Sequence, residues 1–124
     1  MSPENSPRAV TQAYFSHWTA GRFGAAADFL ADDIVVETPI NSYPGKADFV
    51  AALSGFGALV KGANMLVDLA EGDDVVQIYD MDVRGLGVIR MTEHFVIRLG
   101  LITRLRQIHD TAALRAAGFD RGTS

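Results

Sequence analysis

The sequence contains no cysteine, which excludes a disulfide framework and thiol chemistry. It has no apolar run near the roughly 18 residues that a membrane span needs, and its first residues lack the apolar core of a signal peptide. The formal net charge of −4 provides no positive field for nucleic acid. We therefore expect a cytoplasmic protein that has neither nucleic acid nor a membrane as its partner.

Several catalytic signatures are also missing. There is no glycine-rich phosphate loop and no Gly-x-Ser-x-Gly nucleophile elbow. His17, His94 and His109 are not spaced as metal ligands, and Asp80 and Asp82 share a strand face without a histidine partner. We expect no metal and no cofactor, which leaves acid–base catalysis or simple binding.

What remains has the composition of an ordinary globular protein. The chain has 124 residues, of which 48% are hydrophobic and 21% are charged. This length predicts one domain over residues 1–124, with an ordered core at about 7–118, that buries roughly two-thirds of its unfolded surface.

The order of patterns along the chain favours an α+β arrangement. Helical periodicity and capping residues predict three helices near the N-terminus, at 7–20, 22–30 and from about 47 to 57. Period-two alternation predicts five strands, one between the second and third helices and four after the third. A last helical turn is expected at 111–117. The expected strands are 34–38, 64–70, 75–83, 88–98 and 101–110. Helices should therefore pack on one face of a curved sheet.

The strand at 88–98 carries a carboxylate within an apolar face. Alternation places Glu93 on the same side as Ile89, Met91, Phe95 and Ile97. The next strand brings polar residues to this side too, if the hairpin has a three-residue loop with Gly100 as the bulge residue. That register predicts three cross-strand pairs: Glu93 with Leu105, Met91 with Gln107, and Ile89 with His109.

An apolar sheet face that holds one carboxylate, one amide and one imidazole is typical of a binding pocket. Two plainer interpretations stay open: Glu93 is an edge-strand charge that reaches solvent, and His109 is a surface residue. The first helix also has an inward stripe of Val10, Tyr14 and Trp18. Core packing explains this stripe equally well, although a buried tyrosine hydroxyl needs a polar partner.

Three motifs connect this sequence with a known family. They are A-V-x-Q-x-Y from Ala9, A-D-D-x-x-V-E-x-P from Ala31, and Glu93-His94-Phe95 before a glycine-turned hairpin. With them, residues 7–118 resemble the nuclear transport factor 2-like superfamily, and more narrowly its SnoaL-like polyketide cyclases and ketosteroid isomerases. The resemblance implies a cone-shaped, curved, mixed or antiparallel sheet wrapped around N-terminal helices, as in cystatin-like folds.

The resemblance also implies site residues. Tyr14 matches the tyrosine that donates to the developing oxyanion in ketosteroid isomerases, and Glu93 falls where they have a protonated aspartic acid. Their general-base aspartate is replaced by Thr38, and alternation sends the adjacent Glu37 to the opposite face. Tyr14, Glu93 and His109 are therefore the expected catalytic residues, with either Glu93 or His109 as the base. The expected substrate contacts are Trp18, Thr38, Phe56, Met91 and Gln107.

Three functions compete at this point. The first is a cofactor-independent isomerase, cyclase or lyase that acts on a small apolar carbonyl or polyketide-like compound. The second is a non-catalytic pocket for a small hydrophobic molecule. The third is a protein-association module, since the superfamily commonly dimerises through its outer sheet face. Such a homodimer would use Val96, Ile102 and Ile108 on the face opposite the pocket.

Overall fold

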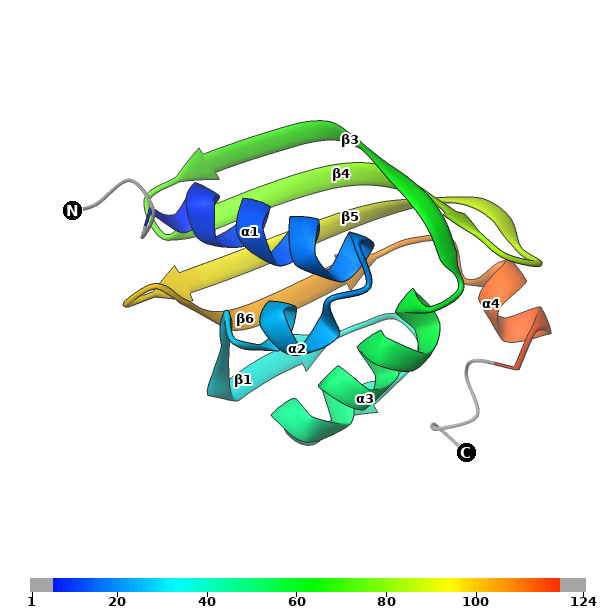
Figure 1. Ribbon diagram of the computed structural model, residues 1–124, viewed down its shortest axis with the longest axis horizontal. Helices are drawn as coiled ribbons and strands as arrows, with labels where there is room; N and C mark the ends of the chain where they lie inside the picture. Colours follow the sequence, from blue (N-terminus) through cyan, green and yellow to red (C-terminus); the bar gives the residue numbers. More distant parts are fainter. Residues whose placement is uncertain (1–5, 119–124) are drawn as a thin grey trace.

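The computed structural model describes residues 6–118 and contains four helices and six strands in that range (Figure 1). In chain order they are α1 (Pro7–Thr19), α2 (Phe23–Ala27), β1 (Leu30–Glu37), β2 (Ser42–Tyr43), α3 (Lys46–Gly57), β3 (Val60–Glu71), β4 (Asp74–Val83), β5 (Gly87–Arg98), β6 (Leu101–Ile108) and α4 (Ala112–Ala116). Within the described residues, no helix is long and apolar enough to cross a membrane.

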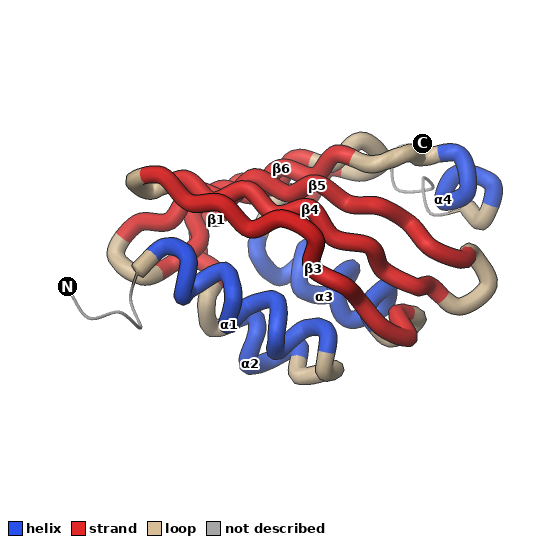
Figure 2. Tube along the Cα trace, turned by 90° about the horizontal axis from the view of Figure 1, so that it is seen from above, coloured by secondary structure: helices blue, strands red, loops and turns tan. Residues whose placement is uncertain are grey.

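The strands form one curved mixed sheet in the order β2-β1-β6-β5-β4-β3. Strands β1 and β6 run parallel, and the other neighbouring strands run antiparallel. Helices α1, α2 and α3 lie against the same face of this sheet, while α4 follows β6 at one end (Figure 2). The α+β prediction is confirmed, and helices and sheet enclose the apolar core between them.

Helix α1 begins as its sequence predicts. Ser6 is the N-cap, and its Oγ accepts a hydrogen bond from Ala9 N at 3.2 Å, while Pro7 occupies the first turn. The inward stripe of Val10, Tyr14 and Trp18 is buried. This places one tyrosine and one tryptophan of α1 over the concave side of the sheet.

The β5–β6 hairpin differs from the predicted three-residue loop. Leu99 and Gly100 both have positive φ, at 54° and 79°, as a two-residue type I′ turn requires. The strands then change register between Val96 and Ile97, so that Ile97 faces Ile102 but Val96 faces Arg104. Thr103 is the extra residue of this bulge, and its hydroxyl donates to Val96 O at 3.1 Å.

The register after this bulge contradicts several predictions. Glu93 faces Gln107, so the predicted pairs Glu93–Leu105 and Met91–Gln107 are both wrong. Gln107 still lies on the predicted side of the sheet, because the observed and predicted registers differ by an even number of residues. Ile102 is fully buried in the core and does not lie on the outer face, where it was expected. The extra residue, Thr103, shifts the in-out alternation of β6 by one, so Ile102 points to the opposite side from the one predicted. Ile108 does lie outside and is 67% exposed.

The predicted boundary between the second helix and the first strand is also wrong. Helix α2 ends at Ala27, and β1 begins at Leu30, which was expected to be helical. Two long-range contacts favour the strand: Leu30 pairs with Ile102, and Ile102 N donates to Phe29 O at 2.7 Å. Neither contact is visible in local periodicity, because both depend on β6 lying beside β1.

Candidate active site

Four polar side chains stand in one row across the helix-facing side of the sheet. Asp68 on β3 faces Gln77 on β4, Gln77 faces Glu93 on β5, and Glu93 faces Gln107 on β6. Cross-strand neighbours of this kind have Cβ atoms roughly 5 Å apart. The row therefore runs continuously under α1, through a sheet face whose other residues are mostly apolar.

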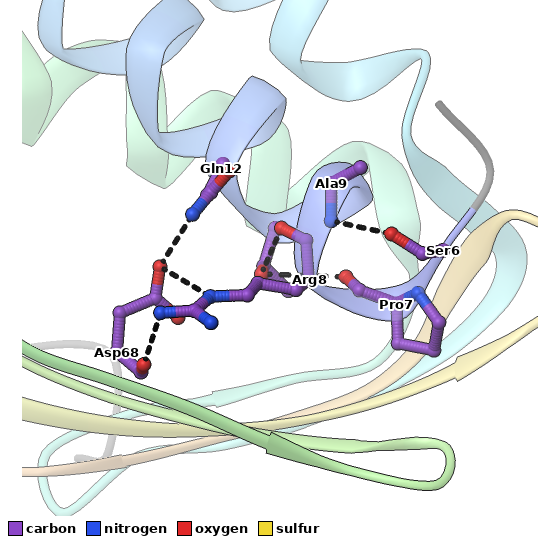
Figure 3. A network of polar contacts seen from close by, with 7 residues as sticks. Ser6, Pro7, Arg8, Ala9, Gln12 and Asp68 are labelled. Atoms are coloured by element: carbon purple, nitrogen blue, oxygen red, sulfur yellow. Dashed lines mark hydrogen bonds and ion pairs between the residues drawn. The ribbon is translucent and has the colours of Figure 1, made fainter. Parts of the chain in front are cut away.

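The Asp68 end of the row holds α1 in place. Gln12 Nε2 donates to Asp68 Oδ2 at 3.0 Å, and Arg8 Nη2 donates to the Asp68 main-chain oxygen at 2.8 Å (Figure 3). Arg8 Nε also lies 3.7 Å from Asp68 Oδ2. These contacts attach the first two turns of α1 to β3, and so help to position Tyr14 and Trp18 further along the helix.

Glu93 occupies the middle of the sheet and is only 2% exposed. Tyr79 Oη donates to its Oε1 at 2.6 Å, and Gln107 Nε2 donates to its Oε2 at 2.9 Å. This burial agrees with the apolar strand face predicted for Glu93. Its hydrogen-bond partners are Tyr79 and Gln107, and neither of the other two predicted catalytic residues, Tyr14 and His109, bonds to it. The strand register explains these partners. Gln107 on β6 lies directly opposite Glu93, and Tyr79 on β4, which faces Met91, is the diagonal neighbour of Glu93.

Burial raises the pKa of Glu93 above the ordinary glutamate value. The hydrogen bonds from Tyr79 and Gln107 oppose this shift, since they stabilise the charged carboxylate, but burial dominates. The pKa values of Tyr14 and Tyr79 are raised too, first by burial and then by the negative charge of Glu93. The two tyrosines therefore stay protonated and act as hydrogen-bond donors.

A cavity of ≈ 460 Å³ lies between this side of the sheet and α1, α3 and α4. All eight residues predicted as catalytic or substrate-binding line it: Tyr14, Trp18, Thr38, Phe56, Met91, Glu93, Gln107 and His109. The other lining residues are Ile40, Asn41, Tyr43, Phe49, Ala52, Leu53, Gly55, Tyr79, Met81 and Leu114. The lining is thus mainly apolar, as in most small-molecule sites.

Aromatic packing fixes the donors of this site. The Tyr79 ring contacts Phe15 and Trp18, with centroids 5.0 and 6.0 Å away. Tyr14 packs against Phe95 at 6.1 Å in an edge-to-face arrangement. Within residues 6–118, the Tyr14 hydroxyl has no hydrogen-bond partner. Tyr79 is thus committed to Glu93, whereas Tyr14 brings an available donor to the cavity wall.

Thr38 contributes to the loop after β1 and not to acid–base chemistry. Its hydroxyl donates to Asn41 O at 2.5 Å and accepts from Asn41 N at 2.9 Å. The adjacent Glu37 points to the opposite face, as predicted, where Arg104 Nη1 donates to it at 2.8 Å. The position of the usual base aspartate therefore carries no titrating group in this cavity.

His109 follows the end of β6 and is partly exposed at the cavity. Its Nδ1 lies 3.1 Å from Asp110 O. Because a carbonyl oxygen only accepts hydrogen bonds, Nδ1 carries the hydrogen, and Nε2 is the nitrogen left to accept a proton. His109 can thus act as a base independently of Glu93.

Tyr79 is a central residue of this site that the sequence analysis did not predict. The alternation of Val75, Gln77, Tyr79 and Met81 along β4 carried a signal, because it groups the four residues on one face. What alternation alone does not give is which residue of the neighbouring strand each one faces. The Tyr79–Glu93 contact requires the β4–β5 register, in which Tyr79 faces Met91.

Comparison with known proteins agrees with this architecture. The sequence profile of the SnoaL-like domain matches residues 11–105. No curated protein matches the chain. An NTF2-like protein of unknown function from Cytophaga hutchinsonii superposes with a TM-score of 0.78 at 20% identity, over 93% of this chain and 99% of that one.

Two further crystal structures carry functional descriptions of their own. A Kribbella flavida protein, proposed to be a ketosteroid isomerase, superposes with a TM-score of 0.75 at 19% identity, over 86% of this chain and 78% of that one. A Sinorhizobium meliloti protein, proposed to be a polyketide cyclase, superposes with a TM-score of 0.71 at 22% identity, over 80% of this chain and 93% of that one. At these identities the structures establish a shared fold, which confirms the predicted NTF2-like architecture.

Proposed function

The chain belongs to the SnoaL-like domain family, and we propose that it is a cofactor-independent acid–base enzyme acting on a small apolar carbonyl compound. The reaction class is isomerisation, cyclisation or a related lyase reaction. One observation carries the proposal: Glu93, a buried carboxyl with a raised pKa, lines an otherwise mainly apolar cavity beside the available hydroxyl of Tyr14.

The chemistry begins with removal of a proton from the carbon next to the substrate carbonyl. The electron pair of that C–H bond moves to form an enolate, and negative charge develops on the carbonyl oxygen. Tyr14 donates a hydrogen bond to this oxygen, and the surrounding low-polarity wall strengthens the interaction. The proton then returns to another carbon in an isomerase. In a cyclase the enolate carbon instead attacks a second carbonyl, whose oxygen takes up the proton from the base.

Two assignments of the base follow from the geometry. In the first, ionised Glu93 takes the proton, and its raised pKa makes it a stronger base than an exposed glutamate. In the second, His109 Nε2 takes the proton, and protonated Glu93 serves with Tyr14 as a neutral donor. Thr38 takes part in neither assignment, since it has no acid–base pKa in the useful range.

A second candidate is a non-catalytic pocket for a small hydrophobic molecule. The observation that favours it is the state of the Glu93 carboxyl, whose two oxygens already accept hydrogen bonds from Tyr79 and Gln107. Such donors make a carboxylate a weaker base. In this case the pocket would bind its ligand without proton transfer.

Hydrogen exchange in D2O separates these candidates without knowledge of the product. Apolar cyclic ketones and lactones are incubated with the protein, and deuterium entering next to the carbonyl is followed by NMR or mass spectrometry. An enzyme accelerates this exchange, and a binding protein does not. Asp80→Asn is the control, because Asp80 lies on the outer face and pairs with Arg90.

Two substitutions then assign the base. If Glu93 is the base, Glu93→Gln abolishes exchange and His109→Ala leaves most of it. If His109 is the base, His109→Ala abolishes exchange and Glu93→Gln reduces it only partly. Exchange that survives both substitutions would show that the site is misplaced, and ketone binding without any exchange would favour the second candidate.

A further inference from the structure

The cavity wall has an unusual combination of groups. Six of its residues are aromatic: Tyr14, Trp18, Tyr43, Phe49, Phe56 and Tyr79. Among the residues the structure describes, no lysine or arginine lines it, and Glu93 is its only carboxyl group. The wall therefore offers aromatic faces, a negative or neutral acid and the imidazole of His109 at its edge, but no permanently charged cation.

The arginines of the sheet point away from this cavity. Arg90 pairs with Asp80 through two hydrogen bonds at 2.7 and 2.9 Å, and Arg104 pairs with Glu37 at 2.8 Å. Both pairs lie on the face of the sheet opposite the helices. No cationic side chain from the sheet is thus placed to neutralise Glu93 or an anionic ligand inside the cavity.

These surroundings discriminate between ligands by charge. A carboxylate ligand would meet the like charge of Glu93 and find no lysine or arginine to pair with. An ammonium group would neutralise Glu93 and would also be attracted by the faces of the aromatic rings. Tertiary and quaternary ammonium groups are the best match, because their alkyl groups suit an apolar wall and they lose little hydration on binding.

We propose that this cavity binds apolar tertiary or quaternary ammonium compounds in preference to neutral compounds of the same shape, with Glu93 as the counter-charge. Trp18 is one ring that can assist, because it lines the cavity and packs against Tyr79, which itself donates to Glu93. The inference uses the same cavity as the proposed function but requires no catalytic step.

A matched pair of ligands tests the preference directly. One is 4-tert-butylbenzyl alcohol, and the other is its 4-trimethylammonio analogue, in which a positively charged nitrogen replaces the quaternary carbon. Calorimetric titration of the unmodified protein at neutral pH and low salt should show the cation binding about tenfold more tightly, as expected for one desolvated charge–aromatic contact. Equal or tighter binding of the alcohol, or no binding of either compound, would overturn the inference.

A substitution then identifies the counter-charge. Glu93→Gln should reduce the ratio of cation affinity to alcohol affinity from about tenfold to about one, because the counter-charge is lost. Asp80→Asn should leave both affinities unchanged, since its charge lies on the other face. A cation preference that survives Glu93→Gln would contradict the assignment to Glu93. Proton exchange into ketones without any cation preference would overturn this inference and leave the proposed function standing.

Discussion

Tyr79 and Glu93 form the central polar contact of the sheet, where the tyrosine hydroxyl donates to the carboxyl at 2.6 Å in a fully buried position. The two residues come from neighbouring strands, and the rings of Phe15 and Trp18 hold the Tyr79 ring in place. Glu93 is therefore held in position and not free to change rotamer. This fixed orientation suits a group that must meet a ligand in a defined geometry.

Tyr79→Phe should lower the free energy of unfolding at neutral pH by about 1.5–3 kcal/mol, the usual range for a hydrogen bond to a charged group. The pKa of Glu93 should rise further, because the lost bond stabilises the ionised form. Urea denaturation measures the first effect. Tyr43→Phe removes a hydroxyl elsewhere in the cavity wall and is the control; equal losses for both variants would contradict a special role for Tyr79.

The raised pKa of Glu93 should make stability depend on pH. The folded protein holds the Glu93 proton more tightly than the unfolded chain, so this contribution to stability is present in full below the unfolded pKa. It is lost as pH rises through the folded pKa. In Glu93→Gln the contribution is absent, so the stability difference between wild type and variant should shift in favour of the variant as pH increases. A difference that stays constant, or moves the other way, would contradict the burial effect.

Gln77 is 1% exposed, and neither its amide nitrogen nor its amide oxygen has a hydrogen-bond partner. Gln77→Met keeps the length of the side chain and removes both unpaired groups. We expect it to raise the free energy of unfolding by about 1 kcal/mol, the lower end of the cost of an unpaired buried polar group. Gln107→Met is the matched control and should destabilise, because Gln107 donates to Glu93. Destabilisation by Gln77→Met would show that its amide is in fact satisfied, for example by internal water.

Leu99 has a φ of 54° and is fully exposed in the β5–β6 turn. A leucine in this left-handed conformation is strained, whereas asparagine adopts it readily and the pair Asn-Gly is preferred in type I′ turns. Leu99→Asn should therefore stabilise the protein by about 0.5–1 kcal/mol in thermal or urea unfolding. Leu101→Asn, in the strand that follows, should not stabilise. An unchanged or lower stability of Leu99→Asn would contradict the described turn.

We propose that two copies associate through the sheet face opposite the helices. Val35 and Ile108 lie on that face and are substantially exposed, whereas Ile102, which was expected there, is buried. Ile108→Asp should convert the dimer into a monomer while the protein stays folded, as its circular dichroism spectrum would show. Light scattering at micromolar protein concentration measures the change in mass. A monomer mass for the unmodified protein would rule out this association.

The sequence was sufficient for the fold and for eight of the residues that line the cavity. Alternation in β5 placed Glu93 and Met91 on the buried side, and the helical spacing of Tyr14 and Trp18 placed both on the inward stripe of α1. These predictions succeeded because each depends on local periodicity, which survives whichever strands become neighbours.

Features that depend on strand register were not predictable in the same way. The bulge at Thr103 changes which residues face Glu93, and it follows a two-residue turn that contains a leucine instead of the usual asparagine. The Tyr79 contact depends equally on the β4–β5 register. Such details follow from the packing of the whole sheet, which no single stretch of sequence specifies.

The most direct test of this account is the titration of Glu93 itself, since the proposed chemistry requires a carboxyl that can hold or release its proton near neutral pH. Carbon-13 NMR of protein labelled at the glutamate side-chain carboxyl follows this group without any substrate, and Glu93→Gln identifies its signal. We predict a midpoint clearly above the ordinary glutamate value, because the side chain is buried. A midpoint at or below that value would show a permanently ionised structural carboxylate, and would contradict the acid–base role assigned to Glu93.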